Sequence, residues 1–262
     1  MALRRHLLRR SLVPLLLLVL LHAAGATPAR DLRLEIVTSS GEGGATPCAS
    51  WRLAVEANNV RDWYSIPADC RGYVSDYMFG DLFRQDCAVV AGEALAYAQG
   101  LELAGDGKEV WVFDVDDTTL TNLPYYADTG FGAEPYNATY FDEYVANATA
   151  PALPEVLGLY ERLLAMGIKV VFITGRHDYQ REPTVKNLHS AGYHTWEKLV
   201  LKTPSSVGLG SSVVPYKSGE RQKLVDAGYR IVGNMGDQWS DLVGAPEGGR
   251  TFKVPDPMYY VG

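Results

Sequence analysis

Three carboxylates directly follow one strand-like segment of this sequence. Residues 110–113 are Val, Trp, Val and Phe, all common in strands, and Asp114, Asp116, Asp117 and Thr118 come next. Carboxylates this close raise one another's pKa unless a cation offsets their charge. A divalent cation with oxygen ligands, most naturally Mg²⁺, meets that need. Taken alone, the pattern is more often a solvated loop or a helix N-cap.

Polar groups also follow two other strand-like segments. Thr174 and Arg176 come after the apolar run at 168–173, and Asp237 and Asp241 come after the segment at 229–236. Open parallel sheets bind ligands beyond the carboxyl ends of their strands. We therefore expect these distant side chains to converge on one crevice.

The elements that position them alternate along the chain. The fold class expected is α/β, with a doubly wound parallel sheet, an N-terminal helical arm over 50–102 and a small irregular insert over 119–150. Strands are predicted at 109–114, 168–174, 197–202, 229–237 and 250–255, and helices at 153–167, 180–192 and 219–228.

Four blocks of the sequence resemble the haloacid dehalogenase (HAD) superfamily of aspartyl-nucleophile phosphohydrolases. They are "FDVDDT", "VVFIT", Lys217 in "YKSGERQKL", and "GDQWSD". The chain is still more similar to plant acid phosphatases of the class B type and to vegetative storage proteins, in "SWRLAVEANNVRDW", "FDVDDTTLTNLPYY", "FITGR" and "GNMGDQWSDL". This resemblance covers residues 46–260. It implies a HAD-like Rossmannoid fold and Mg²⁺-dependent hydrolysis of phosphomonoesters.

The resemblance also implies a role for each residue. Asp114 would be the nucleophile that forms an aspartyl-phosphate, and Asp116 the general acid and base. Thr174 would hold a phosphoryl oxygen, and Lys217 would neutralise developing charge. Mg²⁺ would be bound by Asp114, the Asp116 main-chain carbonyl and Asp237, with Asp241 orienting a metal-bound water.

The sequence leaves the positions or roles of several other charged residues open. Asp117, whose family counterpart is often Glu, is expected in an outward, tolerant position. Arg176 would either touch the substrate or only pair with an acid, and Lys198 and Lys202 would either lie on the surface or reach the site.

The protonation of Asp116 sets the expected pH dependence. Neighbouring carboxylates and the substrate phosphate raise the pKa of Asp116, whereas Mg²⁺ and Lys217 lower it. If the upward effects win, activity should fall as the pH rises above the acidic range.

The first 26 residues indicate a secretory signal peptide. A basic head with four arginines precedes an apolar run at 12–21 and small residues up to Ala26. A transmembrane anchor needs about 20 apolar residues, roughly twice this run. Residues 27–262 would form a single domain, divided into 27–107 (arm) and 108–262 (core). It would be secreted to the extracellular space, the cell wall or the vacuole.

The net charge of the mature chain indicates which classes of partner it can bind. Removal of the signal takes four arginines and no acids, so the net charge falls from −7 to −11, which disfavours nucleic acid. We expect no membrane association after signal removal; a homodimer is possible.

Cys48 and Cys70 lie in loop-like contexts and are the favoured disulfide, whereas Cys87 lies in a helical pattern as a buried thiol.

Three functions are compatible with these residues: a secreted acid phosphatase for small phosphomonoesters, a storage glycoprotein with little activity, and a carbon–halogen hydrolase. The last does not need a second acid at Asp116. A storage relative could lack the nucleophile, whereas Asp114 is present here. The sequence therefore favours the phosphatase.

The secretory reading makes a direct prediction. The mature chain should begin at Thr27 and carry a glycan at Asn137, Asn147 or both, since each lies in an Asn-X-Thr sequon. N-terminal sequencing of the plant-expressed protein and its mobility before and after deglycosylation would check this. Retention of Met1 together with an unchanged mobility would contradict it.

Overall fold

Five parallel strands form the centre of the structure, a computed structural model that describes residues 46–203 and 212–262. The predicted signal peptide and the first part of the arm, up to residue 45, lie outside the described residues. The strand order is β3-β2-β1-β4-β5. The bounds are β1 Glu109–Phe113, β2 Lys169–His177, β3 Lys198–Lys202, β4 Arg230–Gly236 and β5 Thr251–Lys253. The predicted α/β class with a parallel sheet is confirmed.

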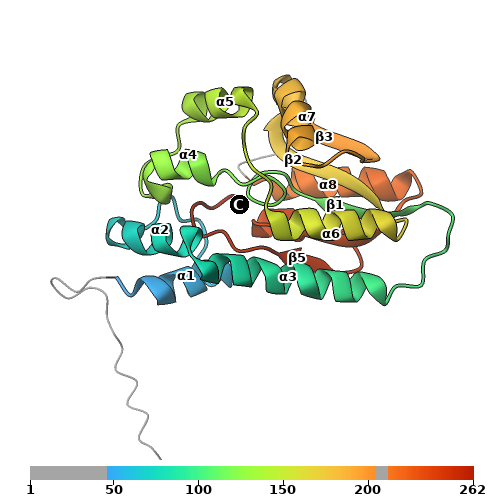
Figure 1. Cartoon of the computed structure of the whole chain (residues 1–262), viewed down its shortest axis with the longest axis horizontal. Coiled ribbons are helices and arrows are strands. Elements are labelled where there is room, and N and C mark those ends of the chain that lie inside the picture. The colour runs from blue at the N-terminus through green and yellow to red at the C-terminus, as the bar shows by residue number, and fades with distance from the viewer. Residues whose placement is uncertain (1–45, 204–211) are drawn as a thin grey trace, which may run out of the picture. The chain divides into compact units, whose positions relative to one another are not determined.

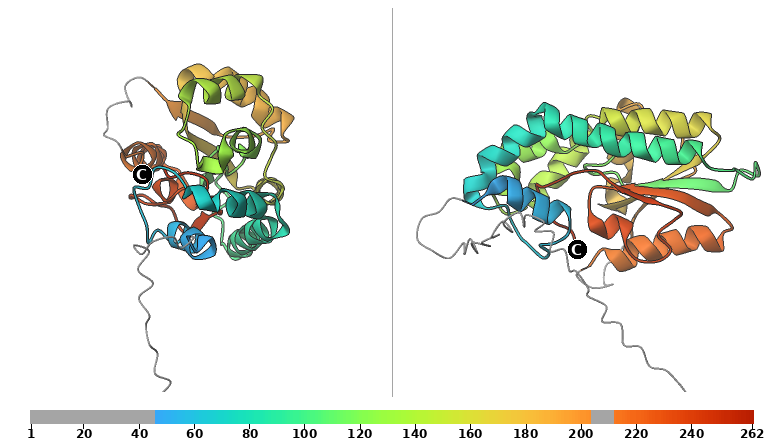
Figure 2. Two further views of the ribbon diagram at one scale, coloured as in Figure 1. Left: turned by 90° about the vertical axis from the view of Figure 1, so that its left-hand side faces the viewer. Right: turned by 90° about the horizontal axis from the view of Figure 1, so that it is seen from below.

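Helices cover both faces of this sheet. On one face α3 (Asp81–Gln99) packs against α6 (Pro154–Ala165), and on the other lies α8 (Val214–Asp226). Figure 1 shows α3 and α6 in front of the strands, and the right-hand view of Figure 2 shows the strands between α3 and α8. Helix α7 (Arg181–Ser190) connects β2 to β3, and the short α9 (Trp239–Leu242) follows β4.

The side chains of β1 explain why its sequence is apolar throughout. Trp111 and Phe113 belong to the core on the α3 and α6 side, whereas Val110 and Val112 belong to the core beneath α8. All four are almost fully buried. A strand covered on both faces needs apolar residues at every position rather than at alternate ones.

Glycine makes room for the largest side chain of this core. A Cβ atom at Gly233 of β4 would lie 2.4 Å from the ring of Trp111, closer than any side chain can approach. Gly233 therefore lets the indole lie flat against the neighbouring strand.

The N-terminal arm is helical, as predicted. It comprises α1 (Cys48–Glu56), the 3₁₀ turn η1 (Ala68–Cys70) and α2 (Arg71–Phe79), which leads into α3. The predicted disulfide between Cys48 and Cys70 is present, and Cys87 is a buried free thiol on α3. Burial raises the pKa of the Cys87 thiol, which makes it unreactive.

The expected irregular insert at 119–150 is instead largely helical. It contains α4 (Leu123–Asp128), the 3₁₀ turn η2 (Gly130–Gly132) and α5 (Ala138–Asn147). The side chain of Asn137 caps α5 by accepting a hydrogen bond from the Tyr140 amide at 3.0 Å. Packing among the tyrosine and phenylalanine rings of α4 and α5 holds the two short helices together, and helical periodicity is hard to see in segments this short.

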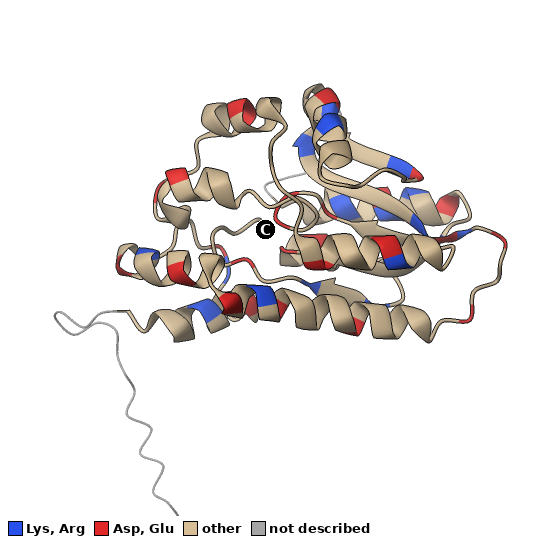
Figure 3. Ribbon diagram, in the orientation of Figure 1, with Lys and Arg blue, Asp and Glu red and all other residues tan. Residues whose placement is uncertain are grey.

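Charged residues of both signs are interspersed along the described helices in Figure 3. Among the described residues, no helix has both the length and the apolar content to span a membrane.

Candidate active site

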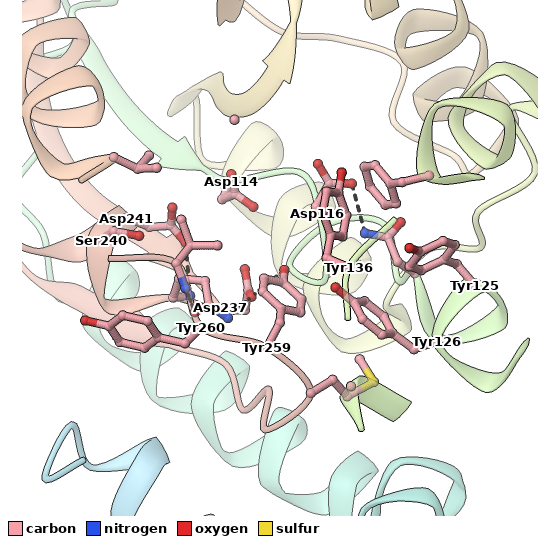
Figure 4. Close-up of a pocket in the computed structure, with 18 of the residues that line it drawn as sticks. Asp114, Asp116, Tyr125, Tyr126, Tyr136, Asp237, Ser240, Asp241, Tyr259 and Tyr260 are labelled. Atoms are coloured by element: carbon pink, nitrogen blue, oxygen red, sulfur yellow. Dashed lines mark hydrogen bonds between the residues drawn. The ribbon is translucent and has the colours of Figure 1, made fainter. Parts of the chain in front are cut away.

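A cavity of about 400 Å³ opens at the carboxyl ends of the central strands. Its walls include five of the residues predicted from sequence: Asp114, Asp116, Lys217, Asp237 and Asp241. The sixth, Thr174, is buried beside Asp116. The predicted convergence is therefore confirmed, and Figure 4 shows Asp114, Asp237 and Asp241 on one side of this space.

Lys217 links two of these carboxylates. Its Nζ donates to Asp114 Oδ1, lies 2.8 Å from Asp241 Oδ1, and donates to the main-chain oxygen of Ile173 at 2.7 Å. Burial disfavours the charge of Lys217, but Asp114 and Asp241 outweigh it and raise its pKa, so the amine stays protonated. The sequence predicts a helix that begins at 219, just after Lys217. Lys217 lies instead in the first turn of α8, which begins at Val214 and accommodates Pro215.

The carboxylates exceed the cationic charge beside them. Oxygens of Asp114, Asp237 and Asp241 lie within 4.8 Å of one another. Burial and the neighbouring acids raise the pKa of Asp114 despite Lys217, and burial together with Asp241 raises the pKa of Asp237 to about 6. A group of buried oxygen ligands that resists full ionisation fits a hard divalent cation.

Asp237 is held in place by three donors. Thr118 Oγ1 donates to Oδ1 at 3.0 Å, while Gln238 Nε2 and the Tyr259 hydroxyl donate to Oδ2 at 2.8 and 2.9 Å. Asp241 is likewise fixed, because its Oδ2 accepts a hydrogen bond from the backbone N–H of Gln238 at 3.0 Å. Thr118 of the first block and Gln238 of the fourth thus help to hold Asp237 and Asp241 as a rigid carboxylate framework before any ligand binds.

Asp116 has a different electrostatic environment. The buried Arg176 guanidinium forms a two-pronged pair with it, at 2.8 and 3.1 Å, and Asn122 Nδ2 donates to it at 2.9 Å. Burial raises the pKa of Asp116, but Arg176 and these hydrogen bonds outweigh burial and hold it below the usual value. Of the two readings of Arg176, the structure supports pairing with an acid.

The expected outward position of Asp117 is wrong. Its side chain is buried, and its backbone φ is +53°, in the left-handed region. The chain turns sharply here. Asp117 Oδ1 closes the turn by accepting a hydrogen bond from the backbone N–H of Asn122 at 2.8 Å. Burial raises the pKa of Asp117 well above its usual value. A carboxylate that stabilises a strained turn cannot be recognised from its neighbours in sequence.

Aromatic side chains line the rest of the cavity. The ring of Tyr126 of α4 stacks on that of Tyr259, with 5.3 Å between the ring centres. The ring centres of Trp63 and Tyr260 are 6.1 Å apart. In Figure 4, Tyr125, Tyr126 and Tyr136 lie on the side of Asp116. Tyr259 lies beside Asp237, and Tyr260 lies on the side of Asp241. Aromatic side chains therefore border the carboxylates of this cavity on more than one side.

Residues 34–262 match the family described as HAD superfamily, subfamily IIIB (acid phosphatase). The chain belongs to this acid phosphatase family. It is 47% identical to acid phosphatase 1 of Solanum lycopersicum over 214 residues, which cover 82% of this chain and 83% of that protein.

The acid phosphatase is also similar to a plant storage protein and to a solved bacterial phosphatase. It is 44% identical to vegetative storage protein 1 of Arabidopsis thaliana, covering 82% of this chain and 78% of that one. The solved class C acid phosphatase of Bacillus anthracis has a TM-score of 0.61 at 22% identity, over 74% of this chain and 86% of that chain. This last likeness shows that the HAD fold is shared.

The acid phosphatase site depends on residues that sequence reasoning missed. Arg221 is 1% exposed, and its guanidinium donates to four main-chain oxygens in the segment after β4: those of Asp241, Val243, Gly244 and Pro246, at 2.5 to 2.7 Å. Arg221 lies four positions after Lys217, on the same side of α8. That spacing was the available signal, because residues i and i+4 of a helix share a face.

Replacing Arg221 with Met should therefore destabilise the protein by roughly 3 kcal/mol, because four main-chain carbonyls, all at least partly buried, would each lose a charged donor. Chemical denaturation of the two proteins would measure this. Arg84→Met is the matched control, since Arg84 pairs with Glu155 at the surface and its loss should cost at most about 1 kcal/mol. Similar losses in the two variants would contradict the role assigned to Arg221.

Proposed function

We propose that this acid phosphatase hydrolyses phosphomonoesters through a covalent intermediate on Asp114, with Mg²⁺ as cofactor. The observation that supports it best is the buried Asp114 carboxylate, held against Lys217 in the same cavity as Asp237 and Asp241. An oriented, partly desolvated carboxylate is an adequate nucleophile for phosphorus.

In the first step, an Asp114 oxygen attacks phosphorus and the bond from phosphorus to the leaving oxygen breaks. Asp116 protonates that oxygen, and the product alcohol departs. In the second step Asp116 takes a proton from water, whose oxygen attacks the phosphorus of the aspartyl-phosphate. Inorganic phosphate leaves and Asp114 is regenerated.

Lys217 and the bound cation would share the electrostatic work. When bound by Asp114, Asp237 and Asp241, and in the family's arrangement by the Asp116 carbonyl, Mg²⁺ would neutralise the charge of the transferring phosphoryl group. Lys217 is already fixed beside the nucleophile, so it would need little reorganisation as charge develops. The Thr174 hydroxyl, buried at the end of β2, would bind a phosphoryl oxygen.

The ion pair of Arg176 with Asp116 suggests a different source for the proton that the reaction needs at acidic pH. Because Arg176 lowers the pKa of Asp116, this carboxylate is ionised in the resting protein even in mildly acidic solution. We infer that the proton enters with the substrate, since the second ionisation of a phosphate ester has a pKa of about 6. Below that pH the monoanionic ester can pass its proton to Asp116. Activity should then decline as the ester loses that proton.

A secretory location is part of this proposal. Asn137 and Asn147 are exposed at the two ends of α5, where oligosaccharides would not disturb the core. The predicted signal peptide and the Cys48–Cys70 disulfide suit an oxidising compartment, with the cell wall, the extracellular space or the vacuole as destination.

The second candidate function is protein storage, favoured by the 44% identity to vegetative storage protein 1. Nothing in a storage role requires a buried nucleophile beside a buried lysine. Because Asp114, Asp116, Thr174, Lys217 and Asp237 are all present and placed together, we propose catalysis as the property that the site retains.

Replacement of Asp114 by Asn tests the central proposal. The wild-type protein should hydrolyse p-nitrophenyl phosphate in mildly acidic buffer with Mg²⁺, and chelation should abolish this. Asp114→Asn should lose at least about 10³-fold in kcat, because its amide cannot form the intermediate. Cooperative unfolding of the variant near the wild-type temperature is the control. Retained activity, with deamidation excluded, would remove Asp114 from the nucleophile role.

A second replacement, Asp116→Asn, tests the general acid. The variant should lose most of its kcat/KM toward an alkyl phosphate, whose leaving oxygen needs a proton, and far less toward p-nitrophenyl phosphate. The ratio of the two losses is the measurement, so differences in folded fraction cancel. Equal losses on both substrates would show that Asp116 does not protonate the leaving group.

A further inference from the structure

Not every cationic side chain around the active-site cavity forms an ion pair with an acid of the described residues. Lys217 is held by Asp114, Asp241 and a main-chain oxygen. Arg176, which lines a smaller pocket that also contacts Asp116, is held by Asp116 and Thr184. Lys202 also lines the cavity, yet it has no ion pair with any acid of the described residues.

The surroundings of Lys202 are unusual for a solvated surface lysine. It is the last residue of β3 and is only partly exposed, with its Nζ 5.6 Å from the centre of the buried Tyr216 ring. Burial and the nearby charge of Lys217 lower the pKa of Lys202, so another cation is close enough to oppose it. Residues 204–211, which follow directly, contain no Asp or Glu.

The position of Lys202 separates it from the reacting phosphoryl group. Strand β3 is two strands away from β1, which carries Asp114, and neighbouring strands are about 4.8 Å apart. Lys202 pairs in register with His177, three residues beyond Thr174. It therefore approaches the cavity from its edge, whereas Lys217 and Thr174 serve the reaction centre.

We propose that Lys202 forms a subsite for a second anionic group of the substrate, a phosphoryl or carboxylate group near the phosphoester that is cleaved. This inference rests on the proposed phosphatase function and specifies its substrate class. A second anion would supply the partner that Lys202 lacks among the described residues, and it would offset the repulsion between Lys202 and Lys217.

The alternative, that Lys202 binds the transferred phosphoryl group itself, makes a different prediction. In that case every phosphomonoester would lose affinity when Lys202 is neutralised. A second-anion subsite predicts a selective loss instead, confined to substrates that carry the additional charge.

The experiment uses Lys202→Gln in the full-length mature protein. Lys198→Gln is the matched control, because Lys198 begins the same strand but is exposed and does not line the cavity. For each protein, kcat/KM is measured with Mg²⁺ on 3-phosphoglycerate and on glycerol 3-phosphate, which differ in a carboxylate. Inorganic pyrophosphate and phenyl phosphate form the second pair and test a phosphoryl group as the additional anion.

We expect Lys202→Gln to lower kcat/KM about 10-fold for at least one substrate that carries the second anion, and less than about 2-fold for its partner without it. Lys198→Gln should change neither. The pair that responds identifies the anion as carboxylate or phosphoryl. Equal losses within both pairs, or no loss in either, would overturn the proposal.

Binding separates this result from failure of the phosphatase proposal. Titration calorimetry with inorganic pyrophosphate and with inorganic phosphate needs no turnover. Lys202→Gln should weaken pyrophosphate binding selectively, even in the Asp114→Asn background. If wild-type protein fails to hydrolyse phenyl phosphate, the phosphatase proposal falls. If pyrophosphate binds Lys202→Gln as tightly as wild type, the subsite falls.

Discussion

The buried contact of Lys217 with Asp114 and Asp241 is the interaction on which the site depends. Three carboxylates at the ends of β1 and β4 cannot share one small volume as anions without a compensating charge. Lys217 supplies part of that charge from α8, and the remaining excess is what a divalent cation would neutralise. Arg221, one turn further along α8, fixes the backbone that carries Asp241.

Two aspartates separated by one residue are thereby given opposite properties. Asp114 is buried among carboxylates, which raise its pKa, whereas Asp116 faces Arg176, which lowers its pKa. The turn that follows β1, closed by the buried Asp117, points the two side chains into these different environments. The two roles that we propose for Asp114 and Asp116, nucleophile and proton carrier, would need such different environments, and here the partners that create them come from different strands and helices.

The sequence alone determined the strands of the sheet and the main residues of the site, but not the helices of the insert after β1. Its apolar strands each ended in polar residues, and parallel strands must bring those ends to one edge, so the meeting of Asp114, Asp237 and Asp241 followed from topology. The disulfide between Cys48 and Cys70 could also be chosen, because Cys87 lies in a helical pattern. Each of these features depends on local pattern and strand order.

Only the tertiary structure decided which charges pair. Arg176 could equally have faced the substrate, and its pairing with Asp116 became visible only when the turn after β1 was known. Asp117 was misplaced for the same reason, and Lys202 could not be told from Lys198 until β3 showed which of them lines the cavity. The physical reason is that charge pairing and burial depend on distances of a few ångströms between segments far apart in sequence, and no periodicity encodes those distances.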